Sequence, residues 1–300
     1  MDIQLLARRF CEYSLHIRGY SPDTIKRYRQ IIACYARRSG IISIGQVTEQ
    51  SLRDFFLDGR VSRGWRPRTF ISFYQSLTVF FRWCISNGML ADNPLRDVEL
   101  PKVDRRLPQK LTKQDAMRLM EVVYNLPYAL RYERYRNHAI FAMLLFAGLR
   151  RGELLRLKFA DVDVVNLTIF VSQGKGARDR IIPMSFTLAE TLKRYLVERQ
   201  RLQKTCPEFF TSLLRNSPLS RIALKRLVNK IRQTSGIHFT AHRLRHSFAT
   251  LMLEGGCDIY SLSRMMGHSD IKTTTIYLSA SVEHLRSQVS KHPLNDLVRP

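Results

Sequence analysis

The first hundred residues alternate apolar side chains at helical spacing with residues that stop helices, and this pattern predicts an all-helical unit. Phe73, Leu77 and Phe80 recur at intervals of three and four, which places them on one buried face of a helix. Ser21 followed by Pro22 offers an N-cap and a proline at the first helical position. The predicted helices of this four-helix unit cover residues 3–18, 22–40, 48–57 and 68–88.

The pattern of apolar residues is lost over residues 100–110. The stretch LPKVDRRLPQ contains two prolines and four charged residues, which is typical of an extended basic linker. We therefore divide the chain into an N-terminal helical domain over 1–99, a linker over 100–110, a second domain over 111–280 and a C-terminal tail over 281–300.

The second domain is predicted to be mainly helical with one small β-element. Thr112 is placed to cap its first helix. Residues 167–171 are β-branched and aromatic, a Gly-Lys-Gly turn surrounds Lys175, and an apolar run resumes over 180–184. This is the pattern of a β-hairpin with a lysine near its tip. The expected fold class is therefore mainly α, with a small β-hairpin or sheet in the second of two domains.

The charge of the chain points to a polyanionic partner. Lys and Arg number 49 against 25 Asp and Glu, a formal net charge of +24, of which residues 1–104 carry +6 and residues 105–300 carry +18. Such an excess repels itself in a compact protein, so nucleic acid or an anionic membrane surface is the expected partner. The longest apolar run, 139–149, is shorter than the roughly 20 residues that span a bilayer, which favours nucleic acid.

The cysteines and the N-terminus favour a cytoplasmic protein. Five cysteines are scattered without any CxxC spacing, which argues against a zinc site and against a disulfide framework. The N-terminal segment has the pattern of an amphipathic helix rather than of a signal sequence. We therefore expect a protein of the cytoplasm that is associated with the nucleoid and holds no metal.

Six polar side chains of the second domain stand at predicted turns or in helices near them: Arg150, Lys175, His242, Arg245, His268 and Tyr277. Taken singly, each has an ordinary explanation, such as a solvated arginine at a helix junction or a lysine in a hairpin turn. His242 and Arg245 are three positions apart in a helix capped at Thr240, so they share a face, with His246 beside it. Tyr277 is expected about two turns into the helix that follows Gly267-His268.

Taken together, these six residues occur in the order and approximate spacing of the tyrosine recombinase family, also called the phage integrase family. The strings GLRRGELLRLKFADVD, GKGARDRIIPM, HRLRHSFATLML and MMGHSDIKTTTIY resemble the motifs of that family. The resemblance covers residues 111–278 and extends loosely to SPDTIKRYRQIIACYARR, which looks like the family's helical, SAM-like core-binding domain. Within the family, the chain is most similar to Xer-type recombinases and small integrases of mobile elements.

The chemistry that this resemblance implies suits these residue types. In-line attack on a DNA phosphodiester builds negative charge on the non-bridging oxygens, and fixed cations are the strongest means of stabilising it. Arg150 and Arg245 would form this clamp, because a guanidinium donates two parallel hydrogen bonds to a phosphate. His242 and His268 would add donors, and His242 could also accept the proton of the nucleophile.

The resemblance makes Tyr277 the nucleophile, which would form a 3′-phosphotyrosyl link and free a 5′-hydroxyl. Nearby cations would favour the phenolate, because a free tyrosine has a pKa of about 10. Lys175 would protonate the departing oxygen, and Glu153, one turn after Arg150, would orient or neutralise nearby basic groups. Because the phosphotyrosine stores the bond energy, the resemblance implies no ATP, no cofactor and no metal.

Two basic segments are candidates for DNA contact outside this set. The helix expected over 218–235 carries five basic residues between apolar ones and could lie along the major groove, with a generic basic surface as an equal alternative. The start of the helix over 68–88 would direct two arginines to phosphate. The candidate contacts are Arg66, Arg68, Arg221, Lys225, Arg226 and Lys230.

The leading hypothesis is a site-specific DNA recombinase for integration, excision or dimer resolution. Its partners would be double-stranded DNA with an inverted-repeat site and other recombinase subunits, as a homotetramer on DNA or with a related recombinase. A type IB topoisomerase and a catalytically silent DNA-binding protein are the alternatives; the intact set of six residues argues against the second. Apolar residues recur at helical spacing in the tail over 281–300, which we expect to dock on a neighbouring subunit or, alternatively, to fold back on its own domain.

Overall fold

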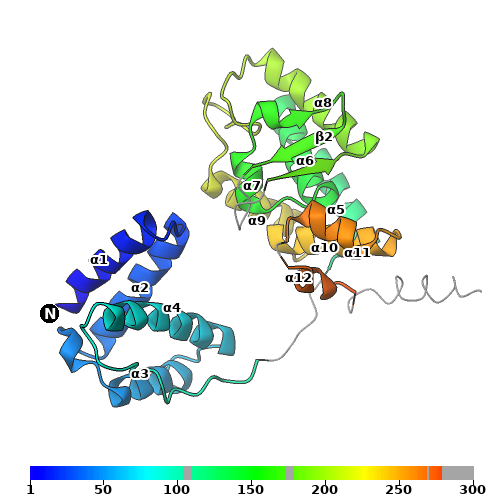
Figure 1. Cartoon of the computed structure of the whole chain (residues 1–300). Helices are drawn as coiled ribbons and strands as arrows, with labels where there is room; N and C mark the ends of the chain where they lie inside the picture. Colours follow the sequence, from blue (N-terminus) through cyan, green and yellow to red (C-terminus); the bar gives the residue numbers. More distant parts are fainter. Residues whose placement is uncertain (104–109, 173–178, 269, 279–300) are drawn as a thin grey trace, which may run out of the picture. The chain divides into compact units, whose positions relative to one another are not determined.

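The computed structural model describes residues 1–103, 110–172, 179–268 and 270–278. It divides the chain into two compact units, with the boundary at residue 105. The first unit is helical and the second is helical with one small sheet (Figure 1), so the predicted fold class is confirmed.

The first unit contains four α-helices and a 3-10 turn: α1 (Ile3–His16), α2 (Pro22–Arg38), η1 (Ile44–Gln46), α3 (Glu49–Val61) and α4 (Pro67–Ser86). The predicted caps form locally. Ser21 Oγ accepts a hydrogen bond from the Thr24 amide at 3.3 Å, and Thr48 Oγ1 accepts one from the Ser51 amide at 3.1 Å. Aromatic rings fill the interior between the helices, among them the fully buried Phe10, Tyr35, Phe80 and Phe81.

The helices of the second unit are α5 (Lys113–Asn125), α6 (Arg131–Phe146), α7 (Arg151–Arg156), α8 (Phe186–Arg201), α9 (Arg221–Ser235), α10 (Ala241–Glu254), α11 (Ile259–Met266) and α12 (Lys272–Thr275), with a 3-10 turn η2 (Phe159–Asp161). The central helix is α6, which packs against α5, α8 and α10. Residues 139–145 in its last turns are buried and only Phe146 at its end is exposed, so most of the longest apolar run of the sequence is core. No helix of the described residues is long and apolar enough to cross a membrane.

A small antiparallel sheet covers one side of this helical core. Its strands are β1 (Val162–Asp163), β2 (Thr168–Val171) and β3 (Arg180–Pro183), in the order β1-β2-β3. The cross-strand pair Ile169 and Ile182 is buried, while the next pair, Phe170 and Ile181, faces outward, as period-two alternation requires. The two strands of the predicted hairpin are confirmed. β1 was missed because two residues carry no readable alternation.

A separate small core joins α10, α11 and the segment after α12. It contains Phe248, Leu253, Leu262, Met266 and Tyr277, all nearly inaccessible to solvent. The chain entering the second unit is fastened to the same helix, because the Leu111 amide donates to Ser247 Oγ at 2.7 Å. The helix α10 is therefore held from both sides.

Candidate active site

Arg150 is placed by a tight turn between α6 and α7. Gly148 has φ +59°, and a Cβ atom there would lie 2.3 Å from Cδ1 of Phe248, so only glycine fits. Arg150 then serves as the N-cap of α7, and its amide donates to Glu153 Oε2 at 2.8 Å. The turn thus projects the Arg150 guanidinium beside the Glu153 carboxylate, one helical turn away.

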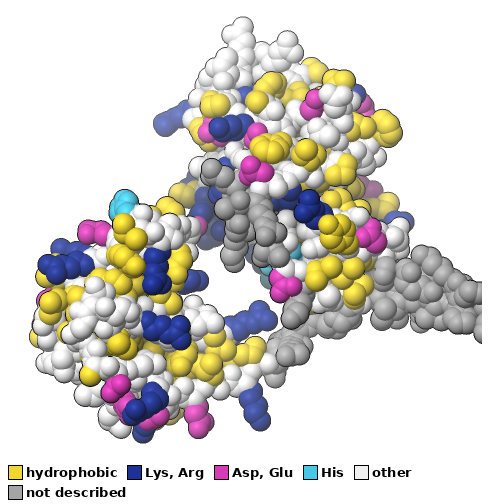
Figure 2. Space-filling view, in the orientation of Figure 1, with side chains coloured by type: hydrophobic (Ala, Val, Ile, Leu, Met, Phe, Trp, Pro, Cys, Tyr) yellow, Lys and Arg dark blue, Asp and Glu magenta, His cyan; other side chains and the backbone are white. Residues whose placement is uncertain are grey.

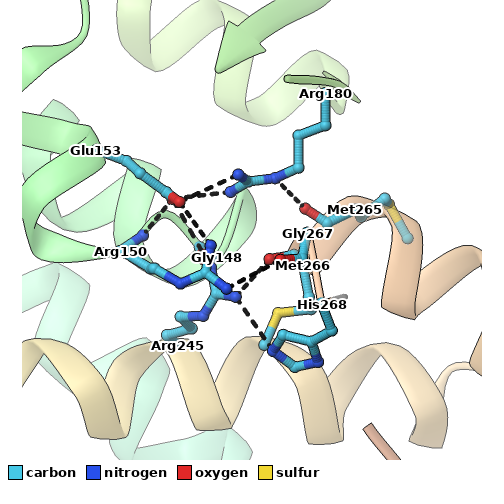
Figure 3. Close-up of polar contacts among 9 residues, drawn as sticks. All are labelled: Gly148, Arg150, Glu153, Arg180, Arg245, Met265, Met266, Gly267 and His268. Atoms are coloured by element: carbon cyan, nitrogen blue, oxygen red, sulfur yellow. Dashed lines mark hydrogen bonds and ion pairs between the residues drawn. The ribbon is translucent and has the colours of Figure 1, made fainter. Parts of the chain in front are cut away.

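Glu153 is a buried carboxylate that is hydrogen-bonded to two guanidiniums and lies 3.9 Å from a third, that of Arg245 (Figure 3). Its Oε1 accepts from Arg150 Nη1 at 2.7 Å and from Arg180 Nη1 at 3.1 Å, and its Oε2 accepts from Arg180 Nη2 at 2.8 Å. Burial would raise the pKa of Glu153, but the hydrogen bonds and charge of Arg180, with those of Arg150, lower it to about 2. Glu153 is therefore ionised at any working pH.

Arg245 lies on α10 with only 3% of its side chain exposed. Its Nη1 donates to the Gly148 carbonyl at 2.6 Å, and its Nη2 donates to the Met266 carbonyl at 2.5 Å (Figure 3). Burial, followed by the positive charge of Arg150, lowers the pKa of Arg245 to about 9. The guanidinium is therefore still protonated at neutral pH, and its orientation is set by main-chain carbonyls.

His268 contacts Arg245 directly, because its Nε2 lies 3.3 Å from Arg245 Nη2, while its Nδ1 lies 2.8 Å from Thr274 Oγ1. Since a guanidinium can only donate, Nε2 accepts and the imidazole carries its proton on Nδ1. Burial and the charges of Arg245 and Arg150 lower the pKa of His268 to about 4, so the ring is neutral at physiological pH.

Tyr277 lies just beyond the end of α12, and not two turns into a helix as the sequence suggested. Its side chain is 2% exposed, and its hydroxyl lies 2.8 Å from His246 Nδ1. Burial raises the pKa of Tyr277, while Arg245 and Arg150 lower it by a smaller amount. In this state the hydroxyl is therefore protonated, although the cations that favour the phenolate are close.

His246 is the contact that sequence reasoning left without a role. It is one helical turn after His242, and the two rings lie with centroids 4.3 Å apart. Burial, followed by the charges of His242 and Arg245, lowers the pKa of His246 to about 4, so the ring is neutral and can accept from Tyr277. The i, i+4 spacing from His242 on the exposed side of α10 was the available signal.

The structure therefore brings Arg150, Arg245, His268 and Glu153 into one connected cluster, with Tyr277 on an adjoining contact to His246. His242 is an exposed neighbour of His246 on α10. Lys175 lies outside the described residues, as does the tail over 281–300. Within the described ranges, no group of three or more His, Cys, Asp or Glu side chains is placed to hold a metal ion.

The candidate DNA contacts lie on the surface. Arg66 and Arg68 are exposed at the start of α4. The four basic residues of α9 are exposed as well: Arg221, Lys225, Arg226 and Lys230. Lys and Arg side chains occur over both units in Figure 2, as the charge of the sequence requires.

Two protonated guanidiniums, a neutral imidazole and a buried phenol form a site suited to an anionic, tetrahedral group beside an oxygen nucleophile. The phage integrase family matches residues 109–284, and the phage integrase N-terminal SAM-like domain matches residues 6–89. This chain therefore belongs to the phage integrase family, and the resemblance noted in its motifs is confirmed.

Individual relatives are tyrosine recombinases. The chain is 34% identical over 283 residues to tyrosine recombinase XerA of Thermococcus kodakarensis, with 94% of each chain covered. It is 32% identical over 296 residues to tyrosine recombinase XerC of Bacillus licheniformis, with 95% of each covered.

Solved structures agree on the fold. The XerH site-specific recombinase bound to palindromic difH substrate, in a post-cleavage complex, has a TM-score of 0.73 at 22% identity, covering 94% of this chain and 82% of that one. A lambda integrase dimer bound to a COC′ core site has a TM-score of 0.71 at 20% identity, covering 92% and 95%.

Proposed function

We propose that this chain is a site-specific DNA recombinase that cuts and rejoins strands of double-stranded DNA through a covalent 3′-phosphotyrosine. The observation that carries the proposal is the cluster of Arg150, Arg245 and His268, whose two arginine charges act on a Tyr277 hydroxyl held by His246. XerA and XerC, its relatives, are tyrosine recombinases, and XerH and lambda integrase were solved on DNA.

In the first step, the Tyr277 oxygen attacks the scissile phosphorus in line with the 5′-oxygen. A bond forms between the tyrosine oxygen and phosphorus, and the bond from phosphorus to the 5′-oxygen breaks. Arg150 and Arg245 stabilise the charge that builds on the non-bridging oxygens. The tyrosine proton passes to His246, the imidazole whose Nδ1 lies 2.8 Å from that hydroxyl. This assignment differs from our sequence-based expectation, in which His242 would take the proton.

The departing 5′-oxygen takes a proton from Lys175, as the family resemblance implies. The phosphotyrosine keeps the energy of the broken bond, so a 5′-hydroxyl from another strand can attack it and restore both the tyrosine and a continuous strand. Because only 2% of Tyr277 is exposed, the small core of α10 and α11 must open at this residue to admit a phosphate.

The test is covalent trapping of DNA. The DNA that stays attached to the denatured protein is sequenced to identify the site, and that site is rebuilt as a duplex nicked next to the cleavage point. Cleavage then releases a short fragment and traps the adduct on a denaturing gel. Tyr277→Phe removes one oxygen and should abolish the adduct while DNA binding survives. Tyr260→Phe, a matched change at an exposed tyrosine of α11, should leave the adduct unchanged.

Assays of the same protein on DNA distinguish the recombinase from the two alternative functions. Relaxation of supercoiled DNA that lacks the recovered site would indicate a type IB topoisomerase. Binding to the site without any adduct would indicate a silent DNA-binding protein. A retained adduct in Tyr277→Phe would show that another residue attacks.

Assembly is a further part of the proposal. We infer that four subunits, or this chain with a related recombinase, act on a pair of inverted-repeat sites, and that the tail over 281–300 docks on a neighbouring subunit in a closed ring. We place this recombination in the cytoplasm, at the nucleoid.

Truncation after Ser281 tests this docking. Binding to a single half-site should be largely preserved, while cooperative filling of paired half-sites and strand exchange should be lost. If the truncated chain fills both half-sites cooperatively and recombines at the parent rate, the tail only packs on its own domain.

A further inference from the structure

Three consecutive carbonyls at the end of α11 each accept a hydrogen bond from an arginine of a different element (Figure 3). Arg180 Nε, from β3, donates to Met265 at 2.8 Å, Arg245 Nη2 donates to Met266 at 2.5 Å, and Arg150 Nη2 donates to Gly267 at 3.0 Å. The last carbonyls of a helix have no partner within it and carry its negative end, so they attract cations. Two of the three arginines belong to the proposed phosphate clamp; Arg180 has no role in it yet.

Burial and contacts with Glu153 and Gly267 fix the position of the Arg180 side chain. Only 7% of its side chain is exposed, and its two terminal nitrogens bind both oxygens of Glu153. A Cβ atom at Gly267 would lie 2.9 Å from Arg180 Cδ, so the arginine occupies the space that a larger residue would need. Gly267 also has φ +62°, which favours glycine independently. The turn that leads to His268 is thus shaped around the Arg180 side chain.

The shared carboxylate explains what Arg180 does for its neighbour. Glu153 has two oxygens, and both are within 3.1 Å of Arg180 nitrogens, while Arg150 contacts only Oε1 through its side chain. Without Arg180, Oε2 would keep the Arg150 amide and have Arg245 Nη1 at 3.9 Å, so the carboxylate would pair more closely with the guanidiniums of Arg150 and Arg245. Closer pairing would offset more of the positive charge of the clamp and turn its guanidiniums away from a phosphate.

We infer that Arg180 is a positioning residue for the phosphate clamp: it occupies Glu153 and the Met265 carbonyl, and thereby leaves the guanidinium of Arg150 available to the non-bridging oxygens. This inference rests on the proposed function, since it assigns Arg180 a part in the same phosphoryl transfer. Arg180 does not touch the reacting atoms and acts through Glu153 and the end of α11.

The experiment compares two substrates at the trapped cleavage step. One carries the normal phosphate, and the other carries a methylphosphonate at the scissile position, where one non-bridging oxygen is replaced by a neutral methyl group. Arg180→Met keeps the length of the side chain and removes its charge. On normal DNA it should cleave about 100-fold more slowly at saturating protein, which is the cost of a clamp displaced by roughly 1 Å. Affinity for the site should change by less than about threefold, because the binding surface is untouched.

On the methylphosphonate, the deficit of Arg180→Met should shrink to within about threefold of the parent for at least one diastereomer, because one arginine of the clamp then has no charge to neutralise. A purely structural role predicts an equal deficit on both substrates and would overturn the inference. In a Glu153→Gln background, Arg180→Met should slow cleavage further by less than about threefold. The effects of the two changes are not additive if Arg180 acts through Glu153.

Controls keep the outcomes distinguishable. Arg194→Met, at an exposed arginine of α8, should match the parent on both substrates. If Arg180→Met does not fold, Arg180→Lys retains a charge for Glu153 but cannot bind both carboxylate oxygens and Met265 together, and the same substrate pattern is expected with a loss of about tenfold. An adduct in the parent with no substrate-dependent deficit in either variant refutes the role of Arg180. Absence of any adduct in the parent refutes the proposed recombinase function instead.

Discussion

The two units of this chain differ in how many polar and charged side chains their cores bury. Among the described residues of the first unit, the buried polar side chains are the hydroxyls of Ser14 and Ser76, and the rest of the core is aliphatic, aromatic or cysteine. The described part of the second unit buries five charged residues, Arg136, Glu153, Glu198, Arg199 and Arg245, and also nearly all of the Arg180 side chain. Burial of a charge is costly unless it is paired and hydrogen-bonded, so the second unit must supply partners that the first does not need.

The two buried glutamates pair with arginines, whereas the three buried arginines are held largely by main-chain carbonyls. Arg136 donates to Thr211 at 3.2 Å, Arg199 donates to Phe209 at 2.6 Å, and Arg245 donates to Gly148 at 2.6 Å. A carbonyl satisfies a guanidinium without cancelling its charge. The first unit thus relies on apolar packing, whereas the second keeps buried positive charges, of which Arg245 is the one that acts on Tyr277.

The largest effect on stability is expected in the apolar unit. Phe81 is fully buried against Phe80 and Tyr35, so Phe81→Ala should cost about 3–5 kcal/mol of unfolding free energy through lost transfer energy and a cavity. Both tryptophans, Trp65 and Trp83, belong to the first unit, so their fluorescence reports its unfolding alone.

Far-UV circular dichroism reports both units together and serves as the comparison signal. Only the fluorescence transition should move to lower denaturant in Phe81→Ala. If the variant does not fold, Phe81→Leu should show the same selectivity with a loss of about 1.5 kcal/mol or less. A common shift of both signals would show that the units unfold as one.

The next effect concerns the chemistry of the charged unit. Arg150→Ala should slow cleavage by about 10²–10³-fold, because it removes a donor aimed at developing charge. Lys175→Ala should block cleavage of normal DNA but regain it when the departing 5′-oxygen is replaced by sulfur, since a thiolate leaves without a proton. Single-turnover cleavage of the two substrates measures both. Equal rescue of the two variants would show that their roles are not divided in this way.

The same contrast explains what the sequence could reveal. The helices of both units were predictable because their signals are local: caps at Ser21, Thr48, Thr112 and Thr240 are observed as expected. The family motifs also named Arg150, Arg245 and His268, which the structure brings together. The lysine of the hairpin turn and the apolar tail lie outside the described residues and stay predictions.

Contacts between distant segments were not predictable from spacing. Arg180 binds Glu153, 27 positions away, and Met265, 85 positions away, and neither partner is marked by a local pattern. His246 meets Tyr277 across 31 positions, although its helical spacing from His242 was visible. The end of α12 before Tyr277 also had no strong stop signal, so the sequence placed this tyrosine too deep in a helix.

Acid is expected to have a smaller effect on stability, and this effect should differ between the two units. The folded-state pKa of His246 and of His268 is about 4, below the ordinary 6.5, and that of Glu153 is about 2, below the ordinary 4.5. The unfolded chain therefore binds more protons between these values, so stability falls as pH decreases from 6.5 to 4 through the histidines and from 4.5 to 2 through Glu153.

In the described part of the first unit, the groups with strongly shifted pKa values do not titrate in the acid range. Burial raises the pKa of Tyr35 and of Cys84 to about 12, so both are protonated in either state throughout the acid range. Acidification should move the circular dichroism transition before the tryptophan transition, and His246→Asn with His268→Asn should flatten the slope between pH 6.5 and 4. If acid shifts the circular dichroism and tryptophan transitions equally, the two histidines are not the cause of the shift.

The smallest effect is expected from exposed charges, and it measures how each unit meets DNA. Lys225→Gln with Arg226→Gln removes two exposed cations from α9 without disturbing the core. If both contact phosphate, the slope of log affinity against log salt should decrease by about 2, because each lost contact releases about one counterion fewer. Arg66→Gln in the first unit should lower the same slope by about 1. Lys193→Gln is the matched control, since Lys193 already pairs with Glu190 at 2.7 Å on α8. An unchanged slope for the α9 pair would make its basic face an ordinary solvated surface.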